Sequence, residues 1–504
     1  MSRISAILAL VLAPLSGRAT EPLSAIDWLS APPPVSVAKP LLEPLGQLPE
    51  GVRVPEVTVM TLDDARPDSV GLLPAATTGL PPDLWVASDA DRVIGILSRL
   101  AERPLPAVQA LYYTLLLAEA DPPANAGAGA AFLRARLATL RRFGAVDAAL
   151  ALVERAGPAT PALFDIWLNL ALLLGEENAP CAVLAGAPDL SASYANRIFC
   201  TARAGDWATA ALLFDTARAL DLLSPRESAL LAGFLDPETA LLPGPDLAPP
   251  RRMTPLLFRL YEAIGQPLPT ASLPREYAVS DLRGTMGWKA EIEAAERLAR
   301  TGALPANRLL GLYTARQPAA SGGVWTRVRA IADIDTAMQR HASDEIAARL
   351  PKAWDIMTDA GLGMIFATLY GGRLAALDLP GDVAGLAHEI ALLSPEMERA
   401  ARLSSLRSRR ARFLDGLARG APDPTLADTA RERAIAAAFA ATEAPPDLTR
   451  PLARGRLGEV ILSATAGLDG RRDAQAGLAL LRHVGLGDVA RRAALQMLLL
   501  PGRQ

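Results

Sequence analysis

The sequence predicts an all-α fold, an α-solenoid of helical hairpins that follows an extended Pro-rich N-terminal arm. From residue 88 onward, apolar side chains recur at helical spacing in segment after segment, and short links containing Gly, Pro or Asp separate the segments. Almost no stretch alternates between apolar and polar residues over five or more positions, so the pattern does not favour a sheet domain. Helical hairpins bury their apolar faces when each covers its neighbour.

The amino-acid composition argues against several classes of protein function. The chain has 504 residues, of which 51% are hydrophobic, and a formal net charge of −3. The apolar content excludes a wholly disordered chain, and the near-neutral charge argues against a nucleic-acid partner. Because the chain contains only three histidines and two cysteines, we expect no metal site and no cofactor.

The N-terminus has the features of a secretory signal peptide over residues 1–19. Arg3 supplies a positive start, residues 4–15 are mostly apolar, and the small residues Gly17 and Ala19 precede a cleavage point after Ala19. The apolar run is shorter than the ~20 residues of a membrane-spanning helix, and we expect no later transmembrane segment. The sequence therefore predicts a protein exported to a bacterial periplasm.

Residues 20–87 form the predicted arm. Twelve prolines lie within residues 20–85, and proline opposes the formation of packed helices. One interpretation is a flexible linker, and the other is a tether that lies along the body or binds a partner. We expect disorder to about residue 50 and then an irregular segment that docks through apolar residues such as Leu84 and Trp85.

Residues 88–236 are predicted to form a first helical repeat region. Ser88 followed by Asp91 is an N-cap signal, and Ser224 with Glu227 forms a capping box that has proline at the first helical position. The helices expected between these signals cover residues 108–118, 129–142, 145–156, 161–174, 178–186, 191–204 and 207–221.

Two Pro-rich breaks divide the rest of the chain. Five prolines crowd residues 237–251, and three lie within residues 441–451. Because proline interrupts helices, we expect a second helical repeat region over residues 252–441 and a C-terminal helical cap over residues 452–504.

The two cysteines, Cys181 and Cys200, are expected to form a disulfide. In an exported protein two cysteines can pair. Their midpoint lies near residue 190, at the end of a turn over residues 186–189. Residues equidistant from the turn of an antiparallel helical hairpin come opposite each other, which favours the pairing. The alternative is two separate buried thiols.

Two predicted helices have a spacing that resembles the second helix of a tetratricopeptide repeat. In each, a turn glycine is followed after five, four and three residues by small or apolar positions. These positions are Gly205, Ala210, Phe214 and Ala217 in one helix and Gly144, Ala149, Val153 and Ala156 in the other. The resemblance covers part of the chain. It implies a helical protein-interaction scaffold, and it carries over no catalytic or peptide-binding residue.

The sequence indicates no catalytic residue. His341, His388 and His483 are dispersed, so we interpret them as surface or packing residues. No serine occupies a G-x-S-x-G motif, and no lysine directly follows a glycine, which excludes a Walker motif. The adjacent acids at residues 176–177 and 344–345 are interpreted as helix starts or solvated loops.

An arginine cluster between residues 399 and 419 is the densest charge feature. It is a candidate docking site for an anionic partner, which would be a protein, a lipid head group or a cell-wall polymer. The alternative is a solvated helix face, with Leu403, Leu406, Phe413 and Leu417 turned inward. The candidate docking residues are Arg402, Arg407, Arg409 and Arg410.

These features predict an exported, non-enzymatic scaffold that binds other envelope proteins, in an envelope-assembly, motility or secretion machine. The rival function is a superhelical accessory module of a peptidoglycan hydrolase system, because some periplasmic lytic transglycosylases carry long superhelical arms of this composition. Peptidoglycan is then the partner. The lysozyme-like catalytic domain of those enzymes has no counterpart here, since the only Glu-Ser pair, residues 227–228, lies in mid-chain.

Overall fold

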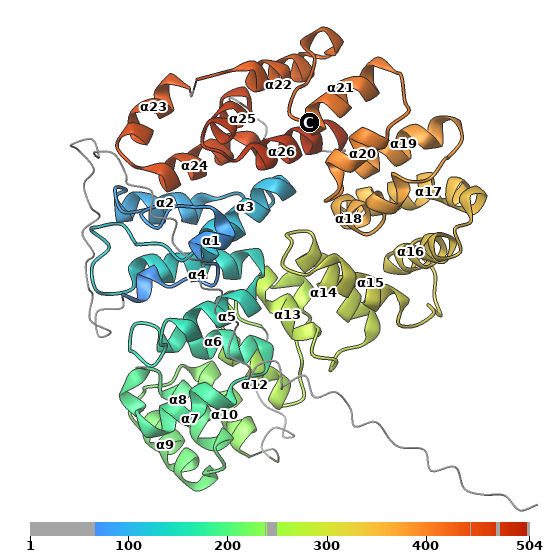
Figure 1. Ribbon diagram of the computed structural model, residues 1–504. Helices are drawn as coiled ribbons and strands as arrows, with labels where there is room; N and C mark the ends of the chain where they lie inside the picture. Colours follow the sequence, from blue (N-terminus) through green and yellow to red (C-terminus); the bar gives the residue numbers. More distant parts are fainter. Residues whose placement is uncertain (1–65, 237, 239–248, 444, 470–473, 501–504) are drawn as a thin grey trace, which may run out of the picture. The chain divides into compact units, whose positions relative to one another are not determined.

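The computed structural model describes residues 66–236, 238, 249–443, 445–469 and 474–500. The predicted signal peptide and residues 20–65 of the predicted arm lie outside the described residues. The chain divides into two units, Met1–Met60 and Thr61–Gln504, and every described residue belongs to the second unit. In the described part there are 25 α-helices and no strand, which confirms the all-α prediction (Figure 1).

Ten α-helices precede the break at residues 237–251. They are α1 (Ala75–Thr78), α2 (Ala90–Arg99), α3 (Pro106–Leu117), α4 (Ala131–Phe143), α5 (Val146–Arg155), α6 (Phe164–Leu174), α7 (Asn178–Gly186), α8 (Tyr194–Arg203), α9 (Trp207–Ala219) and α10 (Pro225–Leu235). From α3 to α10 each helix packs against the next one in the sequence. The observed α7 has the predicted bounds, and the helices around it differ from the predicted bounds by a few residues at their ends.

Eight helices follow in the middle of the chain. They are α12 (Pro255–Ala263), α13 (Ala278–Asp281), α14 (Trp288–Ala299), α15 (Ala306–Thr314), α16 (Val324–Gln339), α17 (Ser343–Asp359), α18 (Gly363–Leu374) and α19 (Gly381–Leu392). Two 3-10 turns, η4 (Thr270–Ser272) and η5 (Arg275–Tyr277), lie between α12 and α13. Helix α12 packs against α6 and α10, and η5 packs against α4.

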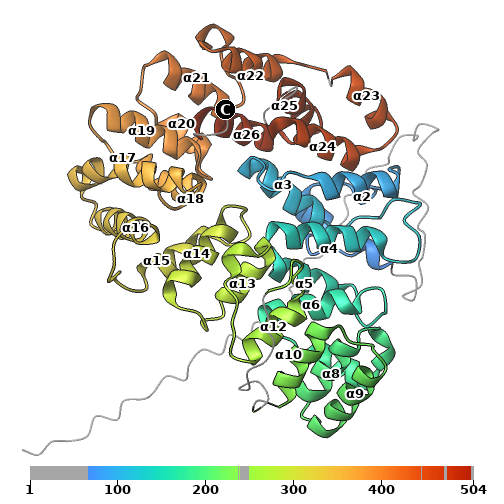
Figure 2. The same ribbon diagram turned by 180° about the vertical axis from the view of Figure 1, so that it is seen from behind.

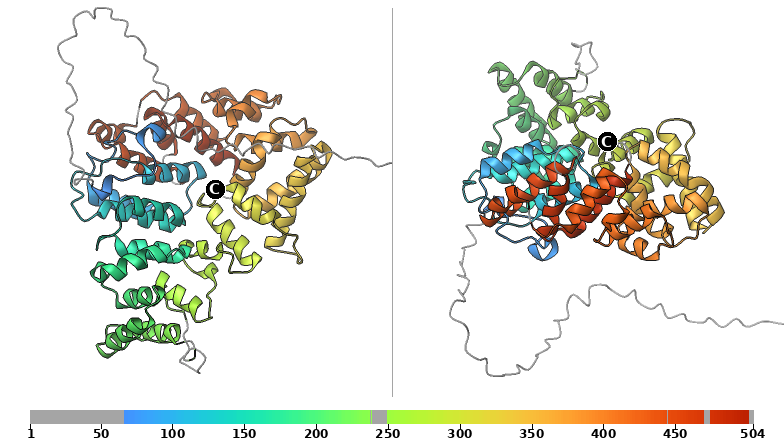
Figure 3. Two further views of the ribbon diagram at one scale, coloured as in Figure 1. Left: turned by 60° about the horizontal axis from the view of Figure 1, so that its bottom comes forward. Right: turned by 90° about the horizontal axis from the view of Figure 1, so that it is seen from above.

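Seven further helices complete the described part. They are α20 (Met397–Leu403), α21 (Arg409–Ala418), α22 (Ala430–Ala440), α23 (Pro446–Ala453), α24 (Leu457–Ala466), α25 (Ala474–His483) and α26 (Gly487–Leu499). Helix α24 packs against α2 and α3, and α26 packs against α3 (Figures 1 and 2). The view from above in Figure 3 shows the same C-terminal helices beside the N-terminal ones. The Ala107 N–H donates to Oε1 of Gln496 at 2.9 Å, which joins residues 389 positions apart.

Two predicted helix starts have different outcomes. The capping box of α10 is confirmed, because Oγ of Ser224 accepts from the Glu227 N–H at 3.2 Å and the Ser224 N–H donates to Oε2 of Glu227 at 2.9 Å. The predicted N-cap at Ser88 is wrong by one residue. Asp89 caps α2 instead and accepts from the Arg92 N–H at 2.9 Å. The Asp89 carboxylate accepts a hydrogen bond from a backbone N–H of the first turn, and its negative charge interacts favourably with the positive end of the helix dipole.

Residues 66–87, the described end of the Pro-rich segment, pack onto the helices through the C-terminus of α3. The last carbonyls of a helix need donors from outside it. Arg136, which is 1% exposed, donates from Nε to the Leu116 carbonyl at 2.8 Å and from Nη2 to the Ala118 carbonyl at 3.0 Å. Its Nη1 donates to the Val70 carbonyl at 2.7 Å. Burial lowers the pKa of Arg136 to about 10, and this one side chain joins the segment to α3 and α4.

Candidate functional site

A cleft of about 670 Å³ lies between α4, the loop that precedes α3, the η4–η5 segment and the end of α14. Arginines dominate its lining, where six of them face two glutamates. The charged lining residues are Arg103, Arg141, Arg142, Arg275, Arg297, Arg300, Glu102 and Glu276. No sequence pattern predicts this cleft, because most of its arginines are distant from one another in the sequence and form no local cluster.

Backbone carbonyls hold several of these arginines in place. Arg297 donates from Nη1 to the Thr270 carbonyl at 2.7 Å and from Nη2 to the Leu273 carbonyl at 2.8 Å. Arg275 donates from Nη1 to the carbonyl of Arg142 at 3.0 Å. A carbonyl fixes the orientation of a guanidinium and leaves its positive charge unneutralised.

Of the six arginines of the cleft, Arg141 and Arg300 pair with carboxylates of described residues, and the other four do not. Arg141 binds Glu276 through both Nε at 2.6 Å and Nη2 at 3.1 Å. Arg300 donates from Nη2 to the buried Glu296 at 3.1 Å. The exposed Arg103 forms no hydrogen bond or ion pair with any residue that the structure describes. Positive charge therefore exceeds negative charge in the cleft.

Placing several positive charges close together in a partly buried cleft is unfavourable, and the pKa values of the arginines shift accordingly. Burial lowers the pKa of Arg142, Arg275, Arg297 and Arg300. Neighbouring arginines act in the same direction, since Arg103 and Arg297 both lower the pKa of Arg275 and Arg300 lowers that of Arg297. The positive charges repel one another, and this repulsion favours an anion in the cleft.

A second, mostly apolar cavity of about 280 Å³ adjoins the cleft, and Arg300 lines both. Helices α3 and α18 and the residues that follow α14 form most of its wall. Gln109 lines this cavity, is 4% exposed, and has neither a donor nor an acceptor partner for its amide within the described part of the chain. Burying an amide group without hydrogen-bond partners costs free energy. The side-chain nitrogen and oxygen of Gln109 both remain available for hydrogen bonds.

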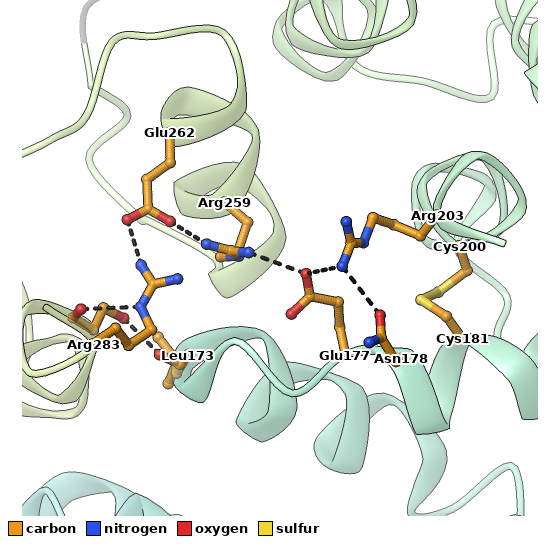
Figure 4. A network of polar contacts seen from close by, with 10 residues as sticks. Leu173, Glu177, Asn178, Cys181, Cys200, Arg203, Arg259, Glu262 and Arg283 are labelled. Carbon is orange, nitrogen blue, oxygen red and sulfur yellow. Dashed lines mark hydrogen bonds and ion pairs between the residues drawn. A yellow bond between two sulfur atoms is a disulfide. The ribbon is translucent and has the colours of Figure 1, made fainter. Parts of the chain in front are cut away.

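The disulfide joins α7 to α8. The sulfur atoms of Cys181 and Cys200 lie 2.05 Å apart, in agreement with the predicted pairing (Figure 4). Glu177 stands at the start of α7 and is 1% exposed. Its Oε1 lies 3.0 Å from Nη2 of Arg259 and 3.4 Å from Nη2 of Arg203. Glu177 starts a helix as expected, and its carboxylate is buried between two arginines.

The ion pairs continue from Glu177 to α13. Arg259 on α12 binds Glu262 from Nη1 at 2.6 Å, and Glu262 also pairs with Arg283 (Figure 4). Arg283 donates from Nε to the carbonyl of Ser280 at 3.0 Å. This chain of contacts connects α7, α12 and α13, so it acts as structural support.

The structure places the four predicted docking arginines in two helices and the link between them. Arg402 lies 3.5 Å from Glu398, Arg409 pairs with Asp428 at 3.3 Å, and Arg410 pairs with Glu389 at 2.8 Å and with Glu432 at 3.6 Å. Each distance is the shortest between a guanidinium nitrogen and a carboxylate oxygen of the pair. Arg407 is exposed and has no hydrogen bond or ion pair with a described residue.

The expectation of one helix through this cluster is wrong. Helix α20 ends at Leu403, α21 begins at Arg409, and Leu403 is 51% exposed. Ser404, Ser405 and Ser408 lie between the two helices and explain the interruption, because serine favours helix ends over helix interiors. Ser408 caps α21 by accepting from the Ala411 N–H at 3.1 Å. Phe413, farther along α21, is buried as expected.

The three histidines lie in different surroundings. His388 is buried on α19, and its Nε2 lies 2.8 Å from Oδ1 of Asp415 on α21. His341 and His483 are exposed. Among the described residues there is no group of three or more His, Cys, Asp or Glu residues suited to a metal ion. None of the described helices combines the length and apolar content needed to span a membrane.

Comparison with protein-family models, with curated proteins and with solved structures finds no match for this chain. The positions that resemble a tetratricopeptide repeat can still be located in the structure. Gly144 and Gly205 have φ of +86° and +91° in the turns before α5 and α9, a conformation that favours glycine. Ala149 and Ala210, five residues later, are fully buried.

Proposed function

We propose that this chain is an exported, non-enzymatic α-solenoid scaffold that binds other envelope proteins in the periplasm. The observation that carries the proposal is the apolar surface of α9 and the turn that follows it. Of the six large apolar side chains that are exposed in the described part, four lie in this segment. They are Trp207 at 50% exposure, Leu212 at 67%, Leu220 at 63% and Leu222 at 44%.

Helix α9 packs against α8 and α10 and uses only part of its surface to do so. Ala210, Phe214 and Ala217 are its buried residues. Exposed apolar side chains that gather in one region are typical of surfaces that bind another protein. The sequential packing from α3 to α10 and the repeat-like spacing of α5 and α9 support a scaffold of stacked hairpins.

The test is crosslinking and affinity capture from periplasm with a double variant, Leu212→Glu and Leu220→Glu. Both side chains point into solvent, so we expect the fold to remain and the captured partner to be lost. The matched control is Leu403→Glu, which places the same change at an exposed leucine outside α9. Equal recovery of the same partner by wild type and the double variant would reject α9 as the binding surface.

The proposed export to the periplasm is tested separately. Mass spectrometry of the protein from the periplasmic fraction should give a mature N-terminus at Thr20, after cleavage at Ala19. A chain that starts at Met1 and stays in the cytosol would contradict the proposal.

The predicted arginine site remains a second part of the proposal. Because Arg409 and Arg410 are paired with carboxylates, the available charge lies mainly at Arg407. We expect Arg407→Glu to lower recovery of an anionic partner, and unchanged recovery would exclude this surface. Incubation with purified peptidoglycan separates the rival function, since release of soluble fragments would indicate a hydrolase system.

A further inference from the structure

We propose that the arginine cleft between α4, η5 and α14 binds a small polyanion, a ligand with two or more phosphate or carboxylate groups. This site goes beyond the proposed scaffold function and does not depend on it. The cleft volume of about 670 Å³ lies within the range of about 300–1,000 Å³ that is common for small-molecule sites.

Positive and negative charges do not balance in the cleft. Elsewhere in the described part, the partly buried Arg327 and Arg259 meet the buried carboxylates of Glu296 and Glu177, whereas the fully buried Arg136 is held by backbone carbonyls. In the cleft, six arginines face two glutamates. Partial burial of several positive charges without matching counter-charge costs free energy. A bound polyanion supplies the missing negative charge.

The protein itself orients two of the cleft arginines. The carbonyls of Thr270, Leu273 and Arg142 fix Arg297 and Arg275 before any ligand arrives. Guanidinium groups that are already oriented lose little conformational freedom on binding, and their planar donors match the oxygens of phosphate and carboxylate groups. Several such donors on different elements favour a ligand with more than one anionic group.

A ligand can reach the cleft from solvent. Arg103 is exposed and lines the cleft with no partner of its own among the described residues. Ala138 on α4 also lines the cleft and is exposed. The cleft is therefore open to solvent beside its most available positive charge.

Titration calorimetry with tripolyphosphate and with citrate tests the proposal on the full chain, at an ionic strength of about 0.15 M. Three variants test whether the charge of the cleft determines binding of these probes. Ala138→Glu adds a negative charge to the cleft and removes no arginine contact. Arg103→Gln removes one positive charge that has no structural partner. Arg316→Gln removes an exposed arginine that lies outside the cleft and outside the predicted docking cluster, and it is the control.

We expect wild type and Arg316→Gln to bind at least one probe with equal affinity. Ala138→Glu should weaken that binding about tenfold or more, and Arg103→Gln should weaken it by a smaller factor. The probe that binds more tightly identifies phosphate or carboxylate as the preferred group. Binding of neither probe to wild type would overturn the proposal, as would equal affinity in wild type and Ala138→Glu when circular dichroism shows both to be folded.

Discussion

The guanidinium of Arg327 holds both oxygens of the Glu296 carboxylate, with Nε 2.6 Å from Oε1 and Nη2 2.8 Å from Oε2. Glu296 is 1% exposed and also accepts from the Tyr313 hydroxyl at 2.8 Å and from Arg300 at 3.1 Å. These groups come from α14, α15 and α16. One buried carboxylate thus joins three consecutive helices.

Replacing this carboxylate should destabilise the protein strongly. In Glu296→Gln the two arginines lose their counter-charge and remain partly buried. Removal of one partner from a buried ion pair costs about 3–5 kcal/mol, and we expect a loss of that size in the free energy of unfolding by urea.

The control for this variant is Glu293→Gln on the same helix. Glu293 is 45% exposed and forms only a surface pair with Lys289 at 3.7 Å. Surface changes of this kind alter stability by about 0.5 kcal/mol or less. Equal effects of the two substitutions would show that the contacts of Glu296 contribute little.

Reduction of the disulfide should lower stability by a moderate amount. Cys181 and Cys200 are separated by 19 residues, and closing a loop of this length in the unfolded chain contributes about 3 kcal/mol. We expect the double variant Cys181→Ser and Cys200→Ser to unfold at lower urea concentration than the oxidised wild type.

Peptide mapping without reductant checks the pairing itself. The oxidised protein should contain no thiol that reacts with an alkylating reagent after unfolding. Two alkylated cysteines would show that the bond is absent from the native protein.

Three buried tyrosines and one partly buried tyrosine should make the fold sensitive to alkali. Burial raises the pKa of Tyr113, Tyr277, Tyr313 and Tyr370 above the usual value of 10.0. Because the folded-state pKa exceeds the unfolded one, their contribution to stability is complete below pH 10 and is lost as the pH rises above it. The arginines whose pKa burial lowers have the opposite effect, namely Arg136, Arg142, Arg275, Arg297 and Arg300.

The measurement is tyrosinate absorbance followed together with helical circular dichroism. We expect these tyrosines to ionise only as helical signal disappears, and to ionise near pH 10 in denaturant. Full ionisation at a lower pH with intact helices would contradict their burial.

Gly458 permits close contact between α24 and the end of the Pro-rich segment. The Gly458 N–H donates to the Leu84 carbonyl at 3.1 Å, and a Cβ at this position would overlap the buried indole of Trp85. We expect Gly458→Ala to destabilise by about 1–3 kcal/mol through overpacking.

Gly311→Ala is a control variant for which we expect the opposite change in stability. Gly311 lies exposed in α15, and a Cβ there would meet no atom within 4 Å. Gly311→Ala should stabilise the helix by up to about 1 kcal/mol. Thermal unfolding of both variants would test the contact, and a gain in stability for Gly458→Ala would contradict it.

The sequence alone determined the features that depend on neighbouring residues. The helical spacing predicted an all-α chain, and the Ser224–Glu227 capping box started α10 where expected. The Cys181–Cys200 pairing was also predictable, because both residues flank one short turn. In each case the partners lie within about one hairpin, so periodicity and capping chemistry suffice.

Only the tertiary structure decided which distant charges meet. Glu177 and Arg259 are 82 residues apart, and Arg141 and Glu276 are 135 apart. In the sequence nothing distinguishes these residues from other charged residues, and the dense arginine cluster near residue 407 is more conspicuous than the arginines of the cleft. Helical periodicity records which face of a helix is apolar but leaves open which other helix covers that face. Long-range packing therefore determines both the cleft and the buried ion pairs.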